Sequence, residues 1–459
     1  MIPLIFLVEE RCYFPMGVLK ILPSPNSFRH ISLPNIFLSS ENLTHKLALV
    51  TFLALELLLC ANFGSLMVQG DTPQLTLLGK SLVTHGGMRY SNAWATAIVE
   101  APNGDLLCAY EDSTSEYVDQ GVIDLKRSSD GGSTWASPNV VCDDTYRCAE
   151  PQFLRRDNRL YLFWAEMQMS GGQSTIKLKH SDDSGYTWSS ATAIYSGNYA
   201  VMSADPIVCQ SGRWVLAFYH RGTATYFTSS VLYSDNQGSA WIKGGDVPSA
   251  NAAVCEPAIV ELSDGTLLMY MRDDNYPNGG KFQYMSKSND GGLSWSAPVA
   301  AIQSPRCQSQ MLKLHDGSFA ITWPDVSSPA NSPRYPFVLR ISTDDCTSWS
   351  PSLIIESGSH DFSNHGMCQR SNGEVIVAYS DDTTLTDIYC ARVKISGTGD
   401  GDGDGDDNQE PNIIEVILNF LKQLGIQPQY IVIGVATIIV GGMGFIAIRS
   451  RRKKKSVVV

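Results

Sequence analysis

Short apolar runs follow polar turns at regular intervals through the middle of the chain. Each turn carries Gly or Asn, at positions 104, 158, 212, 265, 317 and 373, and the run behind it reads DLLCAY in the first copy and EVIVAY in the last. Asn-Gly and Asp-Gly between strand-like runs favour tight hairpins, because these residues accept positive φ angles. The pattern predicts β-hairpins at a period of roughly 50 residues, which is typical of a propeller blade.

A second motif, Ser-x-Asp-x-Gly-x-x-Trp, shares this period. Its copies begin at Ser128, Ser181, Ser234, Ser288 and Ser342. Two copies are weaker, because Asn236 replaces the Asp and Cys346 replaces the Gly. We interpret the motif as structural, since its Ser and Asp can bond turn backbone and its Trp can pack between strands. The six turns predict an all-β fold, a six-bladed β-propeller over residues 75–396, with a strand at 75–83 that closes the ring.

The motif resembles the Asp box of the sialidase (neuraminidase) superfamily of BNR-repeat proteins. The stretch CEPAIVELSDGTLLMYMRDD is similar to the segment that carries the catalytic Glu of sialidases, here Glu256, and one arginine of their substrate-binding triad, here Arg272. Arg334, eight residues before Ser342, matches another triad arginine. Arginine binds a sugar carboxylate as a bidentate fork and stays charged. The other interpretations are a structural salt bridge for Arg272 and a surface loop charge for Arg334.

The chain departs from the sialidase pattern at two positions. Trp94 stands where the resemblance implies the first triad arginine, and Arg89, five residues earlier, could replace it only if the loop is rebuilt. Asn364 stands where the nucleophilic Tyr is expected, and an amide cannot attack in its place. His365 follows it and could act as a base or acid, or be a plain polar residue.

The resemblance also implies a general acid in the loop EDSTSEYVDQGVID. Asp119 is closest to the expected offset, and the rival carboxyls are Glu111, Asp112 and Glu116. Other polar residues fall near the mouth of the central channel by the same register: Glu150, Glu166, Asp205, His220 and Arg221.

Composition narrows the range of partners and cofactors. The net charge is −12 and the pI is about 5.1, so nucleic acid is not an expected partner and an anion site must be built locally from arginine. None of the 11 cysteines lies in a CxxC pair or a zinc-like cluster, so we expect no metal and no cofactor. Cys142 and Cys148 flank a short polar loop; they could form a disulfide in an exported domain or be small apolar strand residues.

The ends of the chain indicate a membrane protein. Residues 430–448 carry no charge and as a helix would span ~28 Å at ~1.5 Å per residue, which is enough for a transmembrane helix. The basic tail 449–459 predicts a cytoplasmic C-terminus and an extracellular propeller. Residues 46–65 are typical of a signal peptide or an N-terminal anchor, and 1–45 remain unassigned.

Two segments connect the propeller to this helix. Residues 397–411 alternate Gly and Asp, which favours an extended tether; they could also be read as a calcium loop, but the bidentate Glu of such a loop is missing. Residues 412–424 are typical of a short amphipathic helix at the bilayer surface.

Three functional hypotheses follow from the sequence. The first is a cell-surface glycoside hydrolase that acts on terminal sialic acid or a related acidic sugar. Without the Tyr, water would attack directly and the anomeric configuration would invert. The second is a non-catalytic lectin or adhesion propeller that binds glycans, and the third is a purely structural surface module.

Overall fold

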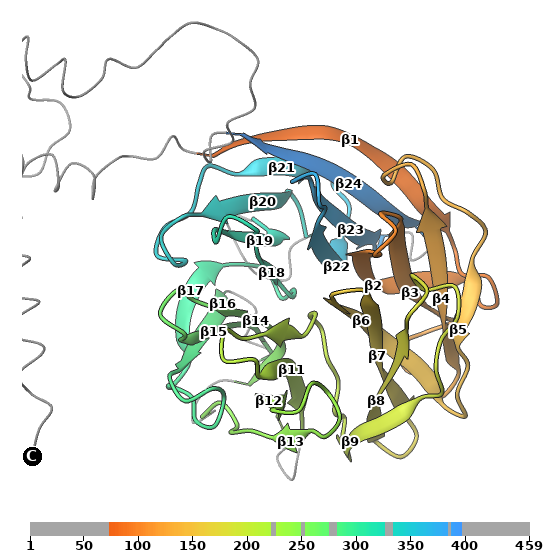
Figure 1. The fold of residues 1–459 in the computed structure, drawn as a ribbon, viewed down its shortest axis with the longest axis horizontal. Helices are drawn as coiled ribbons and strands as arrows, with labels where there is room; N and C mark the ends of the chain where they lie inside the picture. Colours follow the sequence, from red (N-terminus) through yellow and green to blue (C-terminus); the bar gives the residue numbers. More distant parts are fainter. Residues whose placement is uncertain are drawn as a thin grey trace, which may run out of the picture. The chain divides into compact units, whose positions relative to one another are not determined.

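The repeats fold into four-stranded antiparallel sheets that are arranged around a central axis (Figure 1). This computed structural model describes residues 73–221, 226–248, 253–274, 282–325, 334–383 and 387–396. The six sheets confirm the predicted all-β, six-bladed propeller. The predicted signal or anchor segment 46–65 and the segments from residue 397 to 459 lie outside the described residues. In the part of the chain that is described, no helix has the length and apolar character needed to cross a bilayer.

Each of the first five blades contains four consecutive strands. Blade one consists of β2 (Asn92–Glu100), β3 (Leu106–Ser113), β4 (Gly121–Ser128) and β5 (Asn139–Cys142). Blade two consists of β6 (Arg147–Arg156), β7 (Arg159–Gln168), β8 (Gln173–Ser181) and β9 (Thr192–Asn198). Blade three consists of β10 (Ile207–Val208), β11 (Trp214–His220), β12 (Thr228–Ser234) and β13 (Ile242–Lys243). Blade four consists of β14 (Val254–Glu261), β15 (Leu267–Asp273), β16 (Phe282–Ser288) and β17 (Val299–Gln303). Blade five consists of β18 (Gln310–Lys313), β19 (Phe319–Pro324), β20 (Phe337–Ser342) and β21 (Leu353–Glu356).

Blade six is built from both ends of the propeller. It contains β22 (Phe362–Gln369), β23 (Val375–Asp381) and β24 (Asp387–Ser396), and its outer strand is β1 (Gln74–His85). Strand β1 pairs antiparallel with β24, for example Leu77 with Val393. The strand predicted at 75–83 therefore does close the ring, and this pairing joins the two ends of the repeat region.

Strand position within a blade explains the apolar pattern. The first strand of a blade lies near the axis and the fourth lies at the periphery, as Figure 1 shows for β2 and β5. Every residue of β3 and of β23 is buried, because neighbouring blades cover both faces of a second strand. Such strands read as continuous apolar runs. The outer strand β1 instead alternates between exposed and partly buried residues over most of its length.

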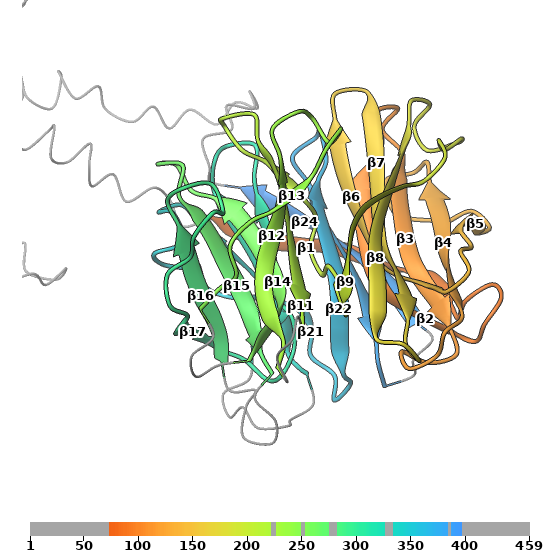
Figure 2. The same ribbon diagram turned by 90° about the horizontal axis from the view of Figure 1, so that it is seen from below.

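The hydrophobic core is divided into six clusters, one between each pair of neighbouring blades. Between blades two and three, for example, Phe163 contacts Trp241 edge-on with ring centroids 5.8 Å apart. The blades stand side by side when the ring is viewed from its edge (Figure 2). A single blade would leave both of its apolar faces in water, so packing of the whole ring provides the hydrophobic stabilisation.

The Ser-x-Asp motif holds a turn at the outer end of each of the first five blades. In blade one, Ser128 Oγ accepts a hydrogen bond from Gly132 N (2.8 Å), and Asp130 accepts bonds from Ser133 N and Thr134 N. The same pattern recurs at Ser181, Ser234, Ser288 and Ser342. These contacts confirm the structural interpretation of the motif.

Cys142 and Cys148 form a disulfide bond across the loop that links blade one to blade two. Of the two interpretations of these cysteines, the disulfide is therefore confirmed and the small apolar strand residues are not. The remaining cysteines in the described residues carry free thiols, and all of them except Cys346 are buried.

Two glycines of blades one and four should differ in their tolerance of alanine. Gly104 (φ 88°) has open space where a Cβ would stand, so Gly104→Ala should cost only the left-handed backbone penalty of about 1 kcal/mol. A Cβ on Gly292 (φ 91°) would lie 2.7 Å from Val231 Cγ2, so Gly292→Ala should cost at least 1–2 kcal/mol, roughly, in addition. Denaturant unfolding of both variants measures the difference, and equal costs would contradict the packing argument.

Loss of the disulfide should destabilise the propeller without changing its fold. The double variant Cys142→Ser/Cys148→Ser should unfold with a free energy about 2 kcal/mol smaller than that of the wild type, because the unfolded chain gains the entropy of an open loop. Thermal unfolding checks this, with the reduced wild type as the matched comparison. Equal stability of oxidised and reduced wild type would count against it.

Candidate functional site

Four inner strands carry the same irregularity near their first residues. The pairing register shifts at Trp94/Ala97 in β2, Ala149/Gln152 in β6, Cys255/Ala258 in β14 and Ser363/Gly366 in β22. In three of these bulges one residue has a left-handed backbone: Glu150 (φ 52°), Glu256 (φ 47°) and Asn364 (φ 47°). A bulge re-aims a side chain, and a left-handed residue other than glycine costs of order 1–3 kcal/mol. We call these three residues the bulge residues. Because all three carry a strained backbone near the start of an inner strand, we take the end of the central channel where these strands begin as the candidate site.

Glu256 and Arg272 form the centre of the site. Arg272 lies on β15 beside the start of β14, and its Nη1 donates to Glu256 Oε1 at 2.5 Å. Asp274 Oδ1 lies 3.7 Å from Nη2 of the same arginine. Burial opposes the charge of Arg272, but Glu256, Cys255 and Asp274 outweigh that effect and hold the pKa of Arg272 well above its ordinary value. The ion pair therefore keeps Glu256 oriented beside a permanent cation.

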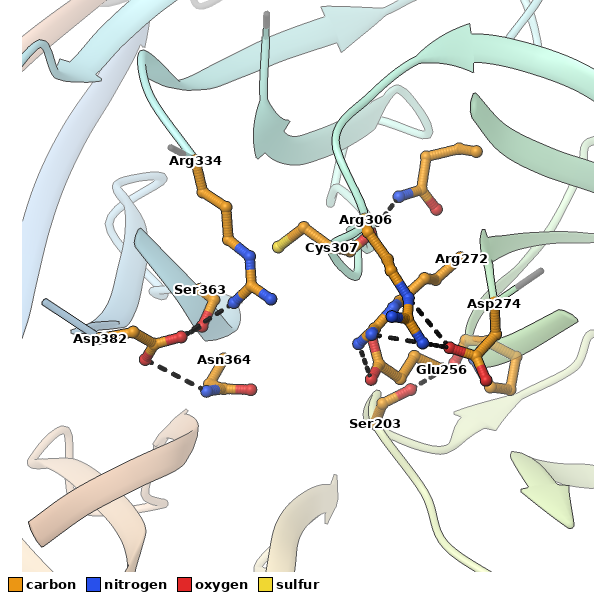
Figure 3. Close-up of polar contacts among 12 residues, drawn as sticks. Ser203, Glu256, Arg272, Asp274, Arg306, Cys307, Arg334, Ser363, Asn364 and Asp382 are labelled. Atoms are coloured by element: carbon orange, nitrogen blue, oxygen red, sulfur yellow. Dashed lines mark hydrogen bonds and ion pairs between the residues drawn. The ribbon is translucent and has the colours of Figure 1, made fainter. Parts of the chain in front are cut away.

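A second arginine, Arg306, joins this group from the connection between β17 and β18. Its Nε donates to Asp274 Oδ1 at 3.1 Å, and its Nη2 contacts the same oxygen. Asp274 thus contacts both Arg272 and Arg306 (Figure 3). Sequence reasoning missed Arg306, because the residue lies outside both repeating motifs and no spacing rule points to it.

Arg334 and Asp382 form a second group from blades five and six. Arg334 Nη1 donates to Asp382 Oδ2 at 2.9 Å, and the backbone amide of Arg334 donates to Asp361. Asp382 also accepts bonds from the Ser363 hydroxyl and from Asn364 Nδ2 (3.4 Å). Burial raises the pKa of Asp382, while Arg334 partly lowers it. The carboxylate therefore fixes Arg334 and the bulge residue Asn364 together.

The two groups lie on opposite sides of the same opening (Figure 3). They are close enough to influence each other, because Arg272 and Glu256 both act on the pKa of Arg334. Arg334 uses only Nη1 in a side-chain hydrogen bond to a described residue. The structure thus brings Glu256, Arg272, Arg334 and Asn364 to one end of the channel, with guanidinium donors left for an anionic ligand.

Three other predicted residues make no described contact with this group. Asp119 accepts bonds from the amide and hydroxyl of Ser170, and these bonds lower the pKa of Asp119. Arg89 pairs with Asp143 at 2.8 Å. Trp94 lies on β2, opposite Glu111 of β3 in the backbone pairing of the two strands. None of the contacts described for these residues reaches Glu256 or the site arginines, although Tyr117 in the loop of Asp119 is influenced by Arg272 and Arg306. The roles of Asp119, Arg89 and Trp94 remain predictions.

His365 lies in the packed interior rather than at the opening. Its side chain is 0% exposed, and its ring packs against Phe337 with centroids 5.0 Å apart. Nε2 donates to the carbonyl oxygen of Thr322 at 3.1 Å. Burial lowers the pKa of His365, the bond to Thr322 opposes this and the charge of Arg334 adds to it, so that the pKa is about 3. The neighbouring bulge residue Asn364 faces the site instead, so the geometry gives His365 a packing role.

The remaining polar residues near the opening have distinct partners. Glu166 pairs with Lys177 at 2.7 Å, and His220 contacts Asp246 at 2.9 Å. Arg221 packs over the Tyr199 and Phe227 rings at 4.6 Å each. Asp205 accepts a bond from Phe153 N at 2.7 Å, and burial raises the pKa of Asp205 to about 7. Among the carboxyls of this set, Glu150 alone makes no hydrogen bond or ion pair with a described residue.

Comparison with known proteins places the chain in a family. A model of the BNR repeat-like domain matches residues 104–387. The chain therefore belongs to the sialidase superfamily of BNR-repeat proteins.

The relatives share the fold at low sequence identity. A sialidase from Micromonospora viridifaciens is 23% identical over 372 residues, which are 68% of this chain and 55% of that protein. The chain thus spans little more than half the length of this relative. Among solved structures, the Hadza microbial sialidase Hz136 matches with a TM-score of 0.58 and 17% identity over 68% of each chain. A protein of unknown function from Dyadobacter fermentans matches with a TM-score of 0.57 and 16% identity, over 72% of this chain and 100% of that one.

The buried His365 should make folding sensitive to acid. In the unfolded chain a histidine has a pKa near 6.5, whereas in the fold the pKa is about 3. The unfolded state therefore binds the proton first, and stability falls as the pH falls from 6.5 toward 3. Between pH 6.5 and 5 the wild type should lose about 1.5 kcal/mol more than His365→Gln does. Urea unfolding at the two pH values measures this difference, and parallel losses would contradict it.

Proposed function

We propose that this protein is a glycoside hydrolase of the sialidase type that removes terminal sialic acid or a related acidic sugar from glycans. The observation that carries the proposal is the convergence of Glu256, Arg272 and Arg334 at one end of the channel, from blades four and five. The sialidase relatives support a glycan as the substrate. The basic tail after residues 430–448 supports anchorage at the cell surface, with the propeller outside.

The arginines would hold the substrate by its carboxylate. Arg334 reaches the opening with its Nη1 fixed by Asp382, and Arg272 reaches it with its Nη1 fixed by Glu256. Arginines that are already oriented lose little side-chain entropy when they bind an anion. Gripping the carboxylate on the anomeric carbon places the bond to be cleaved beside Glu256.

Glu256 would act as the base. Its carboxylate, paired with Arg272, would accept a proton from water as the water oxygen attacks the anomeric carbon. Asn364 has no nucleophilic oxygen of its own to form a covalent intermediate. Direct attack by water inverts the anomeric configuration.

Asn364 also supports a second candidate function, a glycan-binding propeller without turnover. Its amide donates to Asp382 and is able to contact sugar hydroxyls, as a lectin residue would. The two candidates differ in whether Glu256 has a chemical role.

A hydrolysis assay with the full chain separates the candidates. The substrates are a fluorogenic α-sialoside and a panel of other acidic-sugar glycosides, and the anomer released first is identified by NMR. Glu256→Gln should lower kcat by about 10²–10⁴-fold on the substrate that the wild type cleaves. Asp264→Asn, at the exposed hairpin of the same blade, is the matched control and should retain wild-type activity.

The outcomes are distinct. Calorimetric binding of a sialoside without turnover would identify a lectin, and neither binding nor turnover would leave a structural module. Turnover that is unchanged in Glu256→Gln would refute the proposed site.

A further inference from the structure

Blade two presents a carboxyl at the same backbone position as the base of blade four. Glu150 occupies the bulge between Ala149 and Gln152 of β6, as Glu256 occupies the bulge between Cys255 and Ala258 of β14. Both residues have left-handed φ angles, 52° and 47°, and both are partly buried. Equivalent bulges at the same end of two inner strands direct both side chains toward one opening.

The surroundings of the two carboxyls differ in charge. Glu256 contacts the cation Arg272 at 2.5 Å. Glu150 has no such partner in the described chain. Arg147, the cation that acts on its pKa, turns its Nε toward Glu111 (3.3 Å) and its Nη1 toward the carbonyl oxygen of Glu116. The guanidinium group of Arg147 is therefore engaged by Glu111 and Glu116 of blade one.

The titratable groups that influence Glu150 come from blades one to four and are mostly acidic. They are Glu111 on β3, Glu116 in the loop after β3, Arg147 on β6, Tyr219 on β11 and Glu256 on β14. Burial is the largest influence and raises the pKa of Glu150 well above its ordinary value; the charges of Glu111 and Glu256 raise it further, against the opposing effect of Arg147. The pKa of Tyr219 is raised as well, by burial and by the charges of Glu256 and Glu150.

The two carboxyls therefore stand in different electrostatic surroundings. Glu256 is paired with the cation Arg272, whereas burial and neighbouring acids favour the protonated form of Glu150. One carboxyl beside a cation and a second whose protonated form is favoured fit the roles of base and acid in glycoside cleavage.

We propose that Glu150 is the catalytic proton donor of this enzyme. The inference rests on the proposed glycosidase function and names the acid that this function requires. In the step, the Glu150 carboxyl gives its proton to the glycosidic oxygen as the bond from that oxygen to the anomeric carbon breaks, and the bonding electron pair stays on the leaving oxygen. Water forms the new bond to the anomeric carbon and loses a proton to Glu256. Solvent then returns Glu150 and Glu256 to their starting protonation states.

Two other carboxyls fit this role less well. Asp119 accepts bonds from Ser170 at the rim and makes no described contact with the site arginines. Asp205 lies in blade three, where its Oδ1 accepts a bond from the Phe153 amide, so it is committed to joining blades two and three. The carboxyl of Glu150, by contrast, makes no hydrogen bond or ion pair with any residue that the structure describes.

The experiment compares two leaving groups on the same acidic sugar, using the full chain. A 4-methylumbelliferyl aglycone leaves as a stabilised phenolate and needs little protonation, whereas a galactose aglycone leaves as a basic alkoxide and needs an acid. Glu150→Gln should lower kcat/KM by about 10²–10⁴-fold for the galactose-linked substrate and by less than about 10-fold for the umbelliferyl substrate. The basic limb of the wild-type pH–rate profile should also disappear in this variant.

The controls separate this inference from the proposed function. Asp182→Asn, at the opposite rim of blade two, should leave both rates unchanged. Glu256→Gln should lower both rates by similar factors, because water activation does not depend on the leaving group. Equal losses for both substrates in Glu150→Gln, or a leaving-group dependence that appears in Asp119→Asn instead, would overturn the assignment of Glu150 while the glycosidase function stands. A wild type that cleaves neither substrate would overturn both proposals.

Discussion

The fold depends on the burial of each blade against its two neighbours. A four-stranded blade has two apolar faces, and the six core clusters lie only at the boundaries between blades. Pairing of β1 with β24 joins the ends of the repeat region and completes the last blade. Polar contacts also link neighbouring blades, because Glu100 of blade one accepts bonds from Ser371 N of blade six (2.9 Å) and from Arg155 of blade two (3.3 Å). A closed ring of this kind holds its central side chains rigidly.

This rigidity lets an acidic protein keep a cationic site. The net charge is −12, yet Arg272, Arg306 and Arg334 gather at one opening. Each of them is paired with a carboxylate, from Glu256, Asp274 or Asp382. The pairs offset the repulsion between the guanidinium groups and fix their orientation, while donors such as Arg334 Nη2 stay available. Electrostatic preorganisation of this type is a large source of rate acceleration in enzymes.

The sequence predicts the fold well because its signals are local and periodic. Hairpin turns recur in all six blades and the Ser-x-Asp motif in the first five; register then locates Glu256 and Arg272, and the resemblance to sialidases points to Arg334. Periodicity says nothing about connections between blades, so Arg306 could not be found in this way. Periodicity also could not predict the orientation of the His365 side chain, because a bulge at Asn364 decides which of two adjacent side chains faces the channel. A shift of one residue in a strand exchanges the two faces.

The shared bulge makes the chemistry of the channel easy to alter during evolution. The same left-handed backbone holds a glutamate in blade two, another in blade four and an asparagine in blade six. The packed ring already stabilises the left-handed backbone at these three positions. A substitution there can therefore change the side chain in the channel without changing the surrounding backbone. Blades related by duplication could in this way diverge into acid, base and ligand contact, each on an unchanged backbone.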